Sequence, residues 1–129
     1  MNLLIVEDDE DTASFVKYVL EQESFSVRTA SCASEACERL REWRPDLIIL
    51  DRNLPDADGL DLCRELKRAP ELSGIPIMFL SARKDPAEIA ESLDSGGEDY
   101  VTKPFGFVEL VARVQAVLRR RGGAPVSSS

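Results

Sequence analysis

Reactive polar residues follow four short apolar runs that lie far apart in the sequence. They are Glu7 and Asp8 after the first run, Asp51 after the second, and Ser81 and Lys103 after two later runs. If these runs are parallel strands of one sheet, their carboxyl ends share one edge, where carboxylates, a hydroxyl and an ammonium group would converge. This convergence is the main functional signal in the sequence.

The three acids at this edge suggest a metal site. The carboxylates of Glu7, Asp8 and Asp51 would repel one another unless a cation joined them. An all-oxygen site with room for water suits Mg²⁺, with Mn²⁺ as an alternative. The acidic run 7–11 could instead be a solvated segment that favours the positive end of a following helix. The placement of Asp51 on the adjacent strand end favours the metal site.

Length and composition indicate one domain. The chain has 129 residues, and its 43% hydrophobic content is enough for a single core. We expect a domain over 1–121 and a linker-like, flexible tail over 122–129, which is rich in Gly and Ser. The apolar runs are shorter than the roughly 18 residues of a membrane span, and the first residues do not resemble a signal peptide. We therefore expect a cytoplasmic protein with no membrane partner.

The charge balance argues against direct binding to nucleic acid. The net charge is −8, whereas such binding depends on neutralising phosphates with Lys and Arg. The arginines at 119–121 are explained by a helix dipole. The sequence has no histidine, so acids, a hydroxyl and an amine must do the chemistry. The cysteines lack metal-ligand spacing and are expected to be buried, reduced thiols; they are Cys32, Cys37 and Cys63.

Strand-like and helix-like periodicities alternate along the chain. Helices are expected between the strands and after the last one, and the strands are expected at 2–6, 25–30, 47–50, 76–80 and 100–102. Right-handed crossovers then give an α/β fold of five βα units, a doubly wound parallel sheet with the flavodoxin-like strand order 2-1-3-4-5. Ligands bind such folds where the strand order reverses, which is between strands 2–6 and 47–50.

The sequence resembles the receiver domain of two-component response regulators over residues 2 to about 120. The motifs that carry the resemblance occur in the expected order and spacing: Ile-Val-Glu-Asp-Asp at 5–9, Asp51 with Leu-Pro at 54–55 and Asp-Gly at 58–59, Leu-Ser-Ala at 80–82, and Asp-Tyr-Val-Thr-Lys-Pro-Phe at 99–105. The resemblance implies that Asp51 accepts a phosphoryl group from a phosphohistidine of a partner sensor histidine kinase. The domain would then be a switch that assists its own phosphorylation and dephosphorylation, not an enzyme.

The resemblance also implies roles for the residues around Asp51. Asp8 and Asp51 would bind Mg²⁺ with the backbone carbonyl of Asn53, and Glu7 would act mainly through a bridging water. Lys103 would pair with a phosphoryl oxygen, and the peptide bond that follows it would be cis, which is uncommon for X-Pro bonds at roughly 5%.

Two further residues are implicated in switching. Ser81 would donate its hydroxyl to the phosphoryl group, and Tyr100 would turn inward in response, changing the face formed by the fourth helix, the fifth strand and the fifth helix. Simpler interpretations exist for both residues. Ser81 could cap a turn at a strand end, and Tyr100 could be a half-buried packing residue.

The last helix resembles that of a subfamily whose receivers dimerise through this face and control transcription through a winged-helix DNA-binding domain. Asp99 and Arg113 match an intersubunit ion pair of that subfamily. Ile89, however, occupies the place of a basic residue that usually pairs with the acid at Glu109, and Gln115 replaces another basic residue. These departures put the usual homodimer in doubt.

Alternatives from other classes stay open. A receiver-like module could bind proteins without being phosphorylated, although the retained Asp51, Ser81 and Lys103 argue against it. A Mg²⁺-dependent phosphohydrolase with an aspartyl-phosphate intermediate would normally carry an acid where this chain has Asn53. Arg52, where an apolar residue is common, is a milder departure from the receiver pattern, as is Gly97 in place of alanine.

Overall fold

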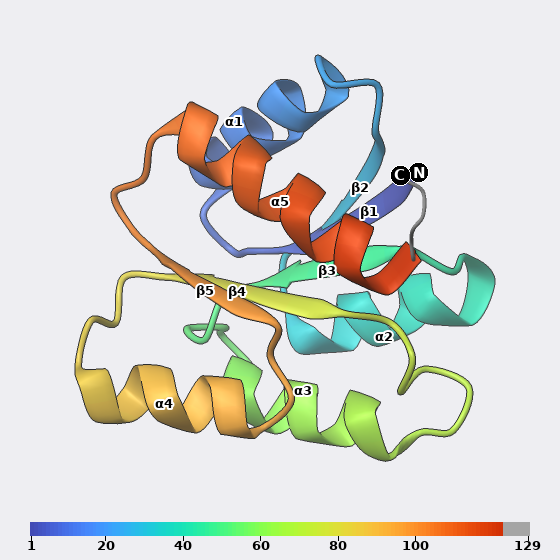
Figure 1. Ribbon diagram of the computed structural model, residues 1–129. Helices are drawn as coiled ribbons and strands as arrows, with labels where there is room; N and C mark the ends of the chain where they lie inside the picture. The colour runs from blue at the N-terminus through green and yellow to red at the C-terminus, as the bar shows by residue number, and fades with distance from the viewer. Residues whose placement is uncertain (123–129) are drawn as a thin grey trace.

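The computed structural model describes residues 1–122 and forms one sheet with helices on both faces (Figure 1). The expected tail, 122–129, lies outside the described residues except for Gly122, which ends the last helix. The elements in chain order are β1 (Asn2–Val6), α1 (Glu10–Glu21), β2 (Ser26–Ala30), α2 (Ala33–Glu42), β3 (Leu47–Leu50), α3 (Gly59–Arg68), β4 (Ile77–Ser81), α4 (Pro86–Asp94), β5 (Asp99–Thr102) and α5 (Phe107–Gly122).

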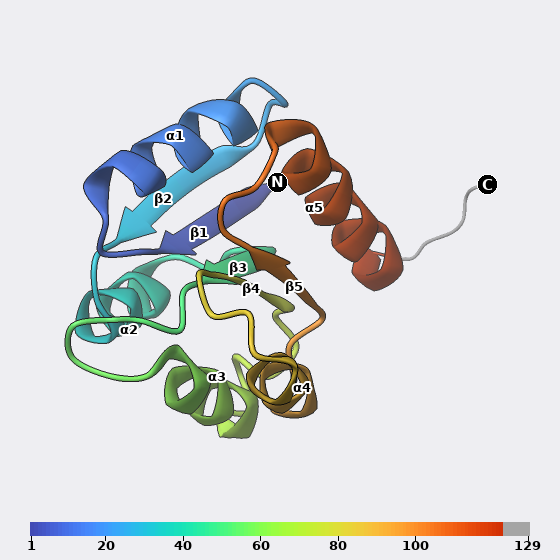
Figure 2. The same cartoon turned by 90° about the vertical axis from the view of Figure 1, so that its left-hand side faces the viewer.

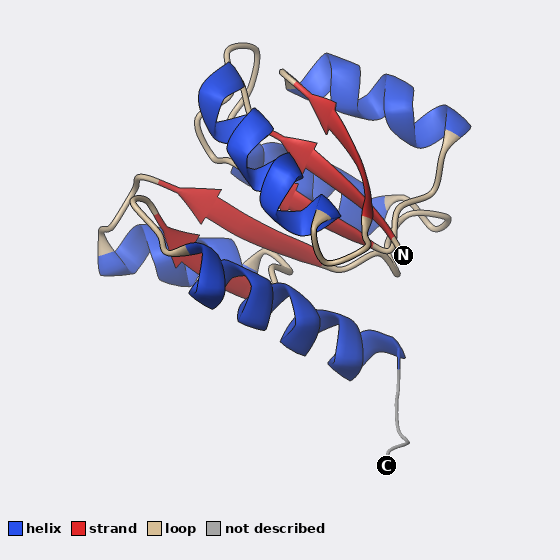
Figure 3. Cartoon of the chain, turned by 90° about the horizontal axis from the view of Figure 1, so that it is seen from above, coloured by secondary structure: helices blue, strands red, loops and turns tan. Residues whose placement is uncertain are grey.

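The sheet is parallel, with strand order β2-β1-β3-β4-β5, so the predicted fold is confirmed. Helices α1 and α5 cover one face, and α2, α3 and α4 cover the other (Figure 2). Figure 3, seen from above, shows the twist of the strands between the two helical layers. This twist follows from the right-handed preference of L-amino-acid strands.

Alternate residues of each strand supply two separate cores. In β3, Ile49 packs in the core beneath α1 and α5, whereas Leu50 packs in the core above α2 and α3. All four residues of β3 are buried, as its continuous apolar sequence predicts for a central strand. Burial of each such side chain stabilises the fold by about 1.5–3 kcal/mol. The two cores fix β3, and hence the position of the residue that follows it.

Some strand boundaries differ from the prediction by one residue, and local contacts set the ends of the helices. Helix α1 begins at Glu10 because the side chain of Asp9 caps it, accepting from the backbone amide of Thr12. Strand β4 includes Ser81, since Ser81 pairs in register with Thr102 of β5. Trp43 lies beyond the end of α2, and the guanidinium of Arg28 lies 4.5 Å from the centroid of its ring.

The cysteines are free thiols within the described part of the chain. The expected burial is confirmed for Cys63 and wrong for Cys32 and Cys37, which are partly exposed. The Sγ of Cys32 caps α2 and accepts a hydrogen bond from the backbone amide of Glu35. Among residues 1–122, no helix is long and apolar enough to cross a membrane.

Candidate functional site

The three acids predicted to meet at the sheet edge do so. Oxygen atoms of Glu7, Asp8 and Asp51 all lie within 4.8 Å of one another. Strands β1 and β3 place them there, because Val6 is in register with Leu50 and the backbone amide of Asp51 donates to the carbonyl of Val6 at 3.0 Å. Glu7 and Asp51 are buried, whereas Asp8 is exposed. The cluster therefore opens to solvent at Asp8.

Lys103 joins this cluster from the end of β5. Its Nζ donates to Glu7 and lies 3.0 Å from Oδ2 of Asp51. Its backbone amide donates to the carbonyl of Ser81 at 2.9 Å, and the peptide bond to Pro104 is cis, as expected. Three carboxylates and one ammonium leave two negative charges, which a divalent cation would balance.

Burial and hydrogen bonding change the pKa values of Glu7 and Lys103. Loss of solvent raises the pKa of Glu7, while the hydrogen bond from Lys103 opposes that rise. Burial also opposes the charge on Lys103, but its hydrogen bonds to Glu7 and Asp51 outweigh that effect and raise the pKa of Lys103. Lys103 therefore stays protonated throughout the neutral range.

The donor set fits a hard divalent cation such as Mg²⁺. Carboxylate oxygens from Glu7, Asp8 and Asp51 are the ligands such ions prefer, and the exposure of Asp8 leaves room for water. The backbone amide of Asn53 donates to Oδ1 of Asp51 at 3.0 Å, which holds Asn53 beside the acids. The role of its carbonyl as a ligand stays a prediction.

Ser81 and Tyr100 both lie inside the molecule. Ser81 is fully buried at the end of β4, and its Oγ accepts from the backbone amide of Arg83 at 3.3 Å. The ring of Tyr100 stacks on Phe79, with centroids 5.9 Å apart. Tyr100 is thus already buried in this structure, and a turn of its ring on phosphorylation stays a prediction.

Glycines allow two close approaches, one beneath Asp51 and one beside the ring of Phe79. A Cβ on Gly59 would lie 2.1 Å from the backbone oxygen of Asp51, so the Asp-Gly motif at 58–59 lets α3 begin directly beneath the acid. A Cβ on Gly97 would lie 2.8 Å from the ring of Phe79. The replacement of alanine by Gly97 is therefore explained by the large side chain at position 79.

Two arginines that the sequence did not assign to the site border it. Arg52, noted only as a departure, is buried and pairs with Asp58 at 3.0 Å. The Nε of Arg83 donates to Oδ1 of Asn53 at 2.8 Å, and its guanidinium pairs with Asp58 at 3.6 Å. The sequence signal for Arg52 was a charged residue directly after Asp51, at a position where an apolar residue is common.

The residues of the predicted intersubunit pair contact each other within one chain. Arg113 of α5 pairs within the same chain, with Asp99 at 3.1 Å and with Glu109 at 3.0 Å. Glu109 lies one helical turn before Arg113 on α5, and Asp99 is the first residue of β5. The one arginine therefore reaches both acids. A contact of Arg113 with a second chain stays a prediction, and it would have to compete with this internal pair.

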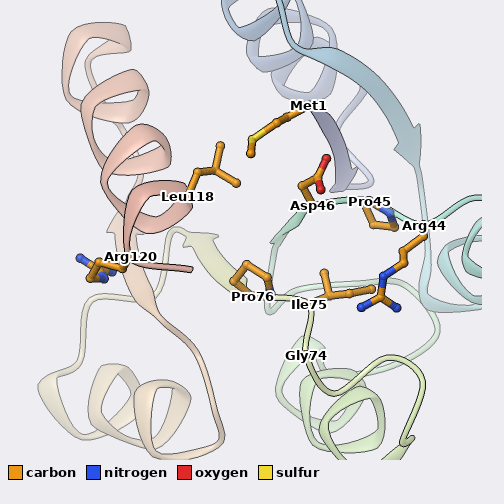
Figure 4. Close-up of a pocket in the computed structure, with 9 residues that line it drawn as sticks. All are labelled: Met1, Arg44, Pro45, Asp46, Gly74, Ile75, Pro76, Leu118 and Arg120. Atoms are coloured by element: carbon orange, nitrogen blue, oxygen red, sulfur yellow. The ribbon is translucent and has the colours of Figure 1, made fainter. Parts of the chain in front are cut away.

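Two hollows flank the sheet at opposite edges. One, of about 350 Å³, lies at the amino ends of the strands, far from the acids, between the end of α5 and the loops before β3 and β4 (Figure 4). Its polar groups have partners within the chain: Arg44 donates to the carbonyl of Glu71, and Asp46 accepts from the amide of Asn2 at 2.7 Å. The other, of about 560 Å³, adjoins Lys103 and is lined by Asp11, Thr12, Phe15, Ala82, Lys103, Pro104 and Phe105.

A doubly wound sheet with an acidic cluster and a lysine at its switch point defines the class of receiver domains. The model of the response regulator receiver domain family matches residues 3–115 of this chain. The chain belongs to that family, and it is a response regulator receiver domain of two-component systems.

Among its relatives, the phosphate regulon transcriptional regulatory protein PhoB of Rhizobium meliloti is 46% identical over 92% of this chain and 52% of its own length. The DNA-binding response regulator MtrA of Mycolicibacterium smegmatis is 43% identical over 95% of this chain and 53% of its own length. A two-component response regulator from Clostridium difficile has a similar structure, with a TM-score of 0.89 and 32% identity over 95% of this chain and 99% of its own. The chain spans about half the length of the curated relatives it matches.

Proposed function

We propose that Asp51 is the phosphoacceptor of this receiver domain and that a sensor histidine kinase is the donor. The observation that carries the proposal is the meeting of Glu7, Asp8, Asp51 and Lys103 at one sheet edge from four distant parts of the chain. A carboxylate oxygen of Asp51 attacks the phosphorus of the donor phosphohistidine. The P–N bond breaks, its electron pair stays on the imidazole nitrogen, and that nitrogen takes up a proton from solvent.

The chain's own residues position and neutralise the reacting groups, which is most of what phosphoryl transfer requires. Lys103 is held beside Asp51 by its bond to Glu7 and by the backbone bond to Ser81, so its charge is in place for a phosphoryl oxygen. Ser81 offers a hydroxyl at the next strand end. Mg²⁺ bound by Glu7, Asp8 and Asp51 would supply charge neutralisation to the phosphoryl oxygens.

The hollow beside Lys103 fits the docking of the kinase. Phe15 of α1 is about half exposed, and its ring lies 6.3 Å from that of Phe105 in the loop after β5. Phe105 is partly buried, so it supports the exposed ring of Phe15 from below. An exposed aromatic ring beside a charged site is typical of an interaction surface. A donor histidine must reach Asp51 over this edge, so the apolar face of a kinase helix would cover Phe15 and Phe105.

The relatives' names include a transcriptional regulatory protein and a DNA-binding response regulator, each about twice as long as the matched part. We therefore infer that this domain controls transcription through an attached DNA-binding domain. The negative net charge of the receiver itself argues that it does not contact DNA directly.

Incubation with acetyl phosphate and Mg²⁺, followed by intact-mass measurement, tests the assignment. We expect one phosphoryl group on the wild-type chain and none on Asp51→Asn. Asp46→Asn, which changes an acid at the opposite edge of the sheet, is the control and should be labelled normally. Equal labelling of Asp51→Asn would overturn the proposal, and rapid multiple turnover of small phosphate esters would favour a phosphohydrolase.

A further inference from the structure

The side chain of Arg52 is buried although it is charged and follows Asp51 directly. Only 3% of it is exposed. Its Nε and Nη2 donate to the two carboxylate oxygens of Asp58 at 3.1 and 3.0 Å, and its backbone carbonyl accepts from the amide of Gly59 at 2.8 Å. These bonds close the loop 52–58, which carries Asn53, against the start of α3.

The third nitrogen of the same guanidinium reaches α4. Nη1 of Arg52 donates to the backbone carbonyl of Glu88 at 3.1 Å and to Oγ of Ser92 at 3.3 Å, and it pairs with Glu91 at 3.4 Å. One side chain therefore joins the loop after Asp51 to a helix that follows β4. We call these residues, Arg52, Asp58, Glu88, Glu91 and Ser92, the Arg52 network.

Helix α4 has little apolar surface to hold it in place. Its only buried residue is the polar Ser92, Ile89 is partly buried, and Leu93 is 41% exposed. Surface helices are normally held by an apolar face packed on the core. The attachment of α4 therefore depends on polar contacts more than that of α3, which buries Leu60, Leu62, Cys63 and Leu66.

The ionised states of Arg52 and Asp58 favour each other. Burial disfavours the charge on Asp58, but the hydrogen bonds from Arg52 and from the amide of Leu60 outweigh it, so the pKa of Asp58 is lowered. The hydrogen bond to Asp58 raises the pKa of Arg52. Arg83 adds a parallel link, since it bonds to Asn53 at 2.8 Å and to Glu88 at 3.3 Å.

We propose that Arg52 is a positioning residue that passes a change at Asp51 to α4. The inference rests on the proposed phosphorylation of Asp51 and names the contact through which α4 responds to it. A phosphoryl group carries about 1.5–2 negative charges. It replaces the single charge of the Asp51 carboxylate, so the site one residue before Arg52 gains up to about one negative charge and three acceptor oxygens. Because the guanidinium is bonded at both ends and has no solvent in which to reorient, a displacement of the loop moves α4 with it.

The variant Arg52→Met separates this role from simple folding. It fills the space with an apolar chain and leaves no partner buried without a hydrogen bond. The Oγ of Ser92 still donates to the carbonyl of Glu88 at 3.0 Å, Asp58 still accepts from the amide of Leu60 at 2.9 Å, and Glu91 is exposed. Loss of one partner destabilises a protein strongly only when it leaves a charge buried and unpaired. The Asp58 side chain is 32% exposed and still pairs with Arg83 at 3.6 Å.

Hydrogen exchange of the α4 amides, measured with and without acetyl phosphate and Mg²⁺, tests the proposal. In the wild-type chain we expect phosphorylation to change exchange in 86–94 by roughly fivefold or more, the low end of allosteric coupling. In Arg52→Met this response should be lost while the mass shift at Asp51 is kept. Arg64→Met, which removes an exposed arginine of α3 paired with Asp61 at 3.8 Å, should respond as wild type.

The outcomes distinguish the two proposals. A wild-type response of α4 in phosphorylated Arg52→Met would overturn the role of Arg52 and leave the phosphoacceptor assignment intact. Absence of a mass shift in the wild-type chain would overturn the phosphoacceptor assignment and this inference with it. If Arg52→Met does not fold, the variant Arg52→Lys keeps a cation beside Asp58, but its single nitrogen does not replace the three nitrogens that join Asp58 to α4. Loss of its response supports the proposal, and an unchanged response overturns it.

Discussion

The hydroxyl of Tyr100 donates a hydrogen bond to the backbone carbonyl of Arg83, with 2.8 Å between the two oxygens. This bond ties β5 to the loop that follows Ser81. Since Ser81 also accepts from the amide of Arg83, both ends of residue 83 are held, one by each predicted switch residue. The positions of Ser81 and Tyr100 are therefore linked through a single residue that the sequence did not single out.

Removal of this bond alone should destabilise the fold modestly. Tyr100→Phe keeps the ring and its stacking on Phe79, but leaves the carbonyl of Arg83 without this donor. We expect a loss of about 0.5–1.5 kcal/mol in the free energy of unfolding, measured with urea. Tyr18→Phe removes a hydroxyl from an exposed ring and should have no effect. Equal stability of Tyr100→Phe and the wild type would argue against the bond.

Restoration of the family's alanine at position 97 should be harmful here. The new Cβ of Gly97→Ala would lie 2.8 Å from the ring of Phe79, and such overpacking costs about 1–3 kcal/mol. Gly106→Ala is a matched control, because no atom lies within 4 Å of the corresponding position. Phe79→Leu should reduce the cost of Gly97→Ala, and strict additivity of the two changes would contradict this account.

Mg²⁺ should stabilise the domain through the exposed acid of the cluster. We expect Asp8→Asn to abolish most of the Mg²⁺-dependent rise in melting temperature, because it removes one carboxylate ligand. Its stability without Mg²⁺ should not fall, since the repulsion within the cluster is reduced. Glu38→Gln, an exposed change on α2, should leave the Mg²⁺ effect intact. An undiminished effect in Asp8→Asn would refute the proposed ligand.

Asp58 should contribute to the loss of stability in acid. Its pKa is lowered in the folded chain, so its contribution is fully present above its unfolded value of about 3.9 and is lost as the pH falls through the lower, folded value. Asp58→Asn should therefore flatten the decline of unfolding free energy below about pH 5. Urea unfolding at several pH values measures this slope, and parallel curves for variant and wild type would contradict the assignment.

The proposed kinase surface predicts that a change at Phe15 slows phosphoryl transfer from the kinase but not from acetyl phosphate. Phe15→Ala should slow transfer from the cognate phosphorylated kinase by about tenfold, equivalent to 1.4 kcal/mol of binding. Labelling by acetyl phosphate should not change, because Phe15 does not contact Asp51. Tyr18→Ala provides a comparison, since Tyr18 is an exposed aromatic on the same helix but does not line the hollow. Equal transfer to Phe15→Ala and wild type would exclude this surface.

The sequence by itself determined the fold and the main site residues. The alternation of buried runs and amphipathic segments specifies parallel strands, and the carboxyl ends of such strands must share an edge. Asp51 and Lys103 could therefore be placed together although 52 residues separate them, because their location depends on backbone topology and not on side-chain detail.

Only the tertiary structure decided the partners of the charged side chains. The same local sequence would allow Arg52 to extend into solvent or Arg113 to reach a second chain. Burial of Arg52 against α4 and the internal pair of Arg113 with Asp99 depend on how α4 and β5 pack against α3 and α5. Long side chains can reach several partners, so their contacts follow from the packing of whole elements, which periodicity does not specify.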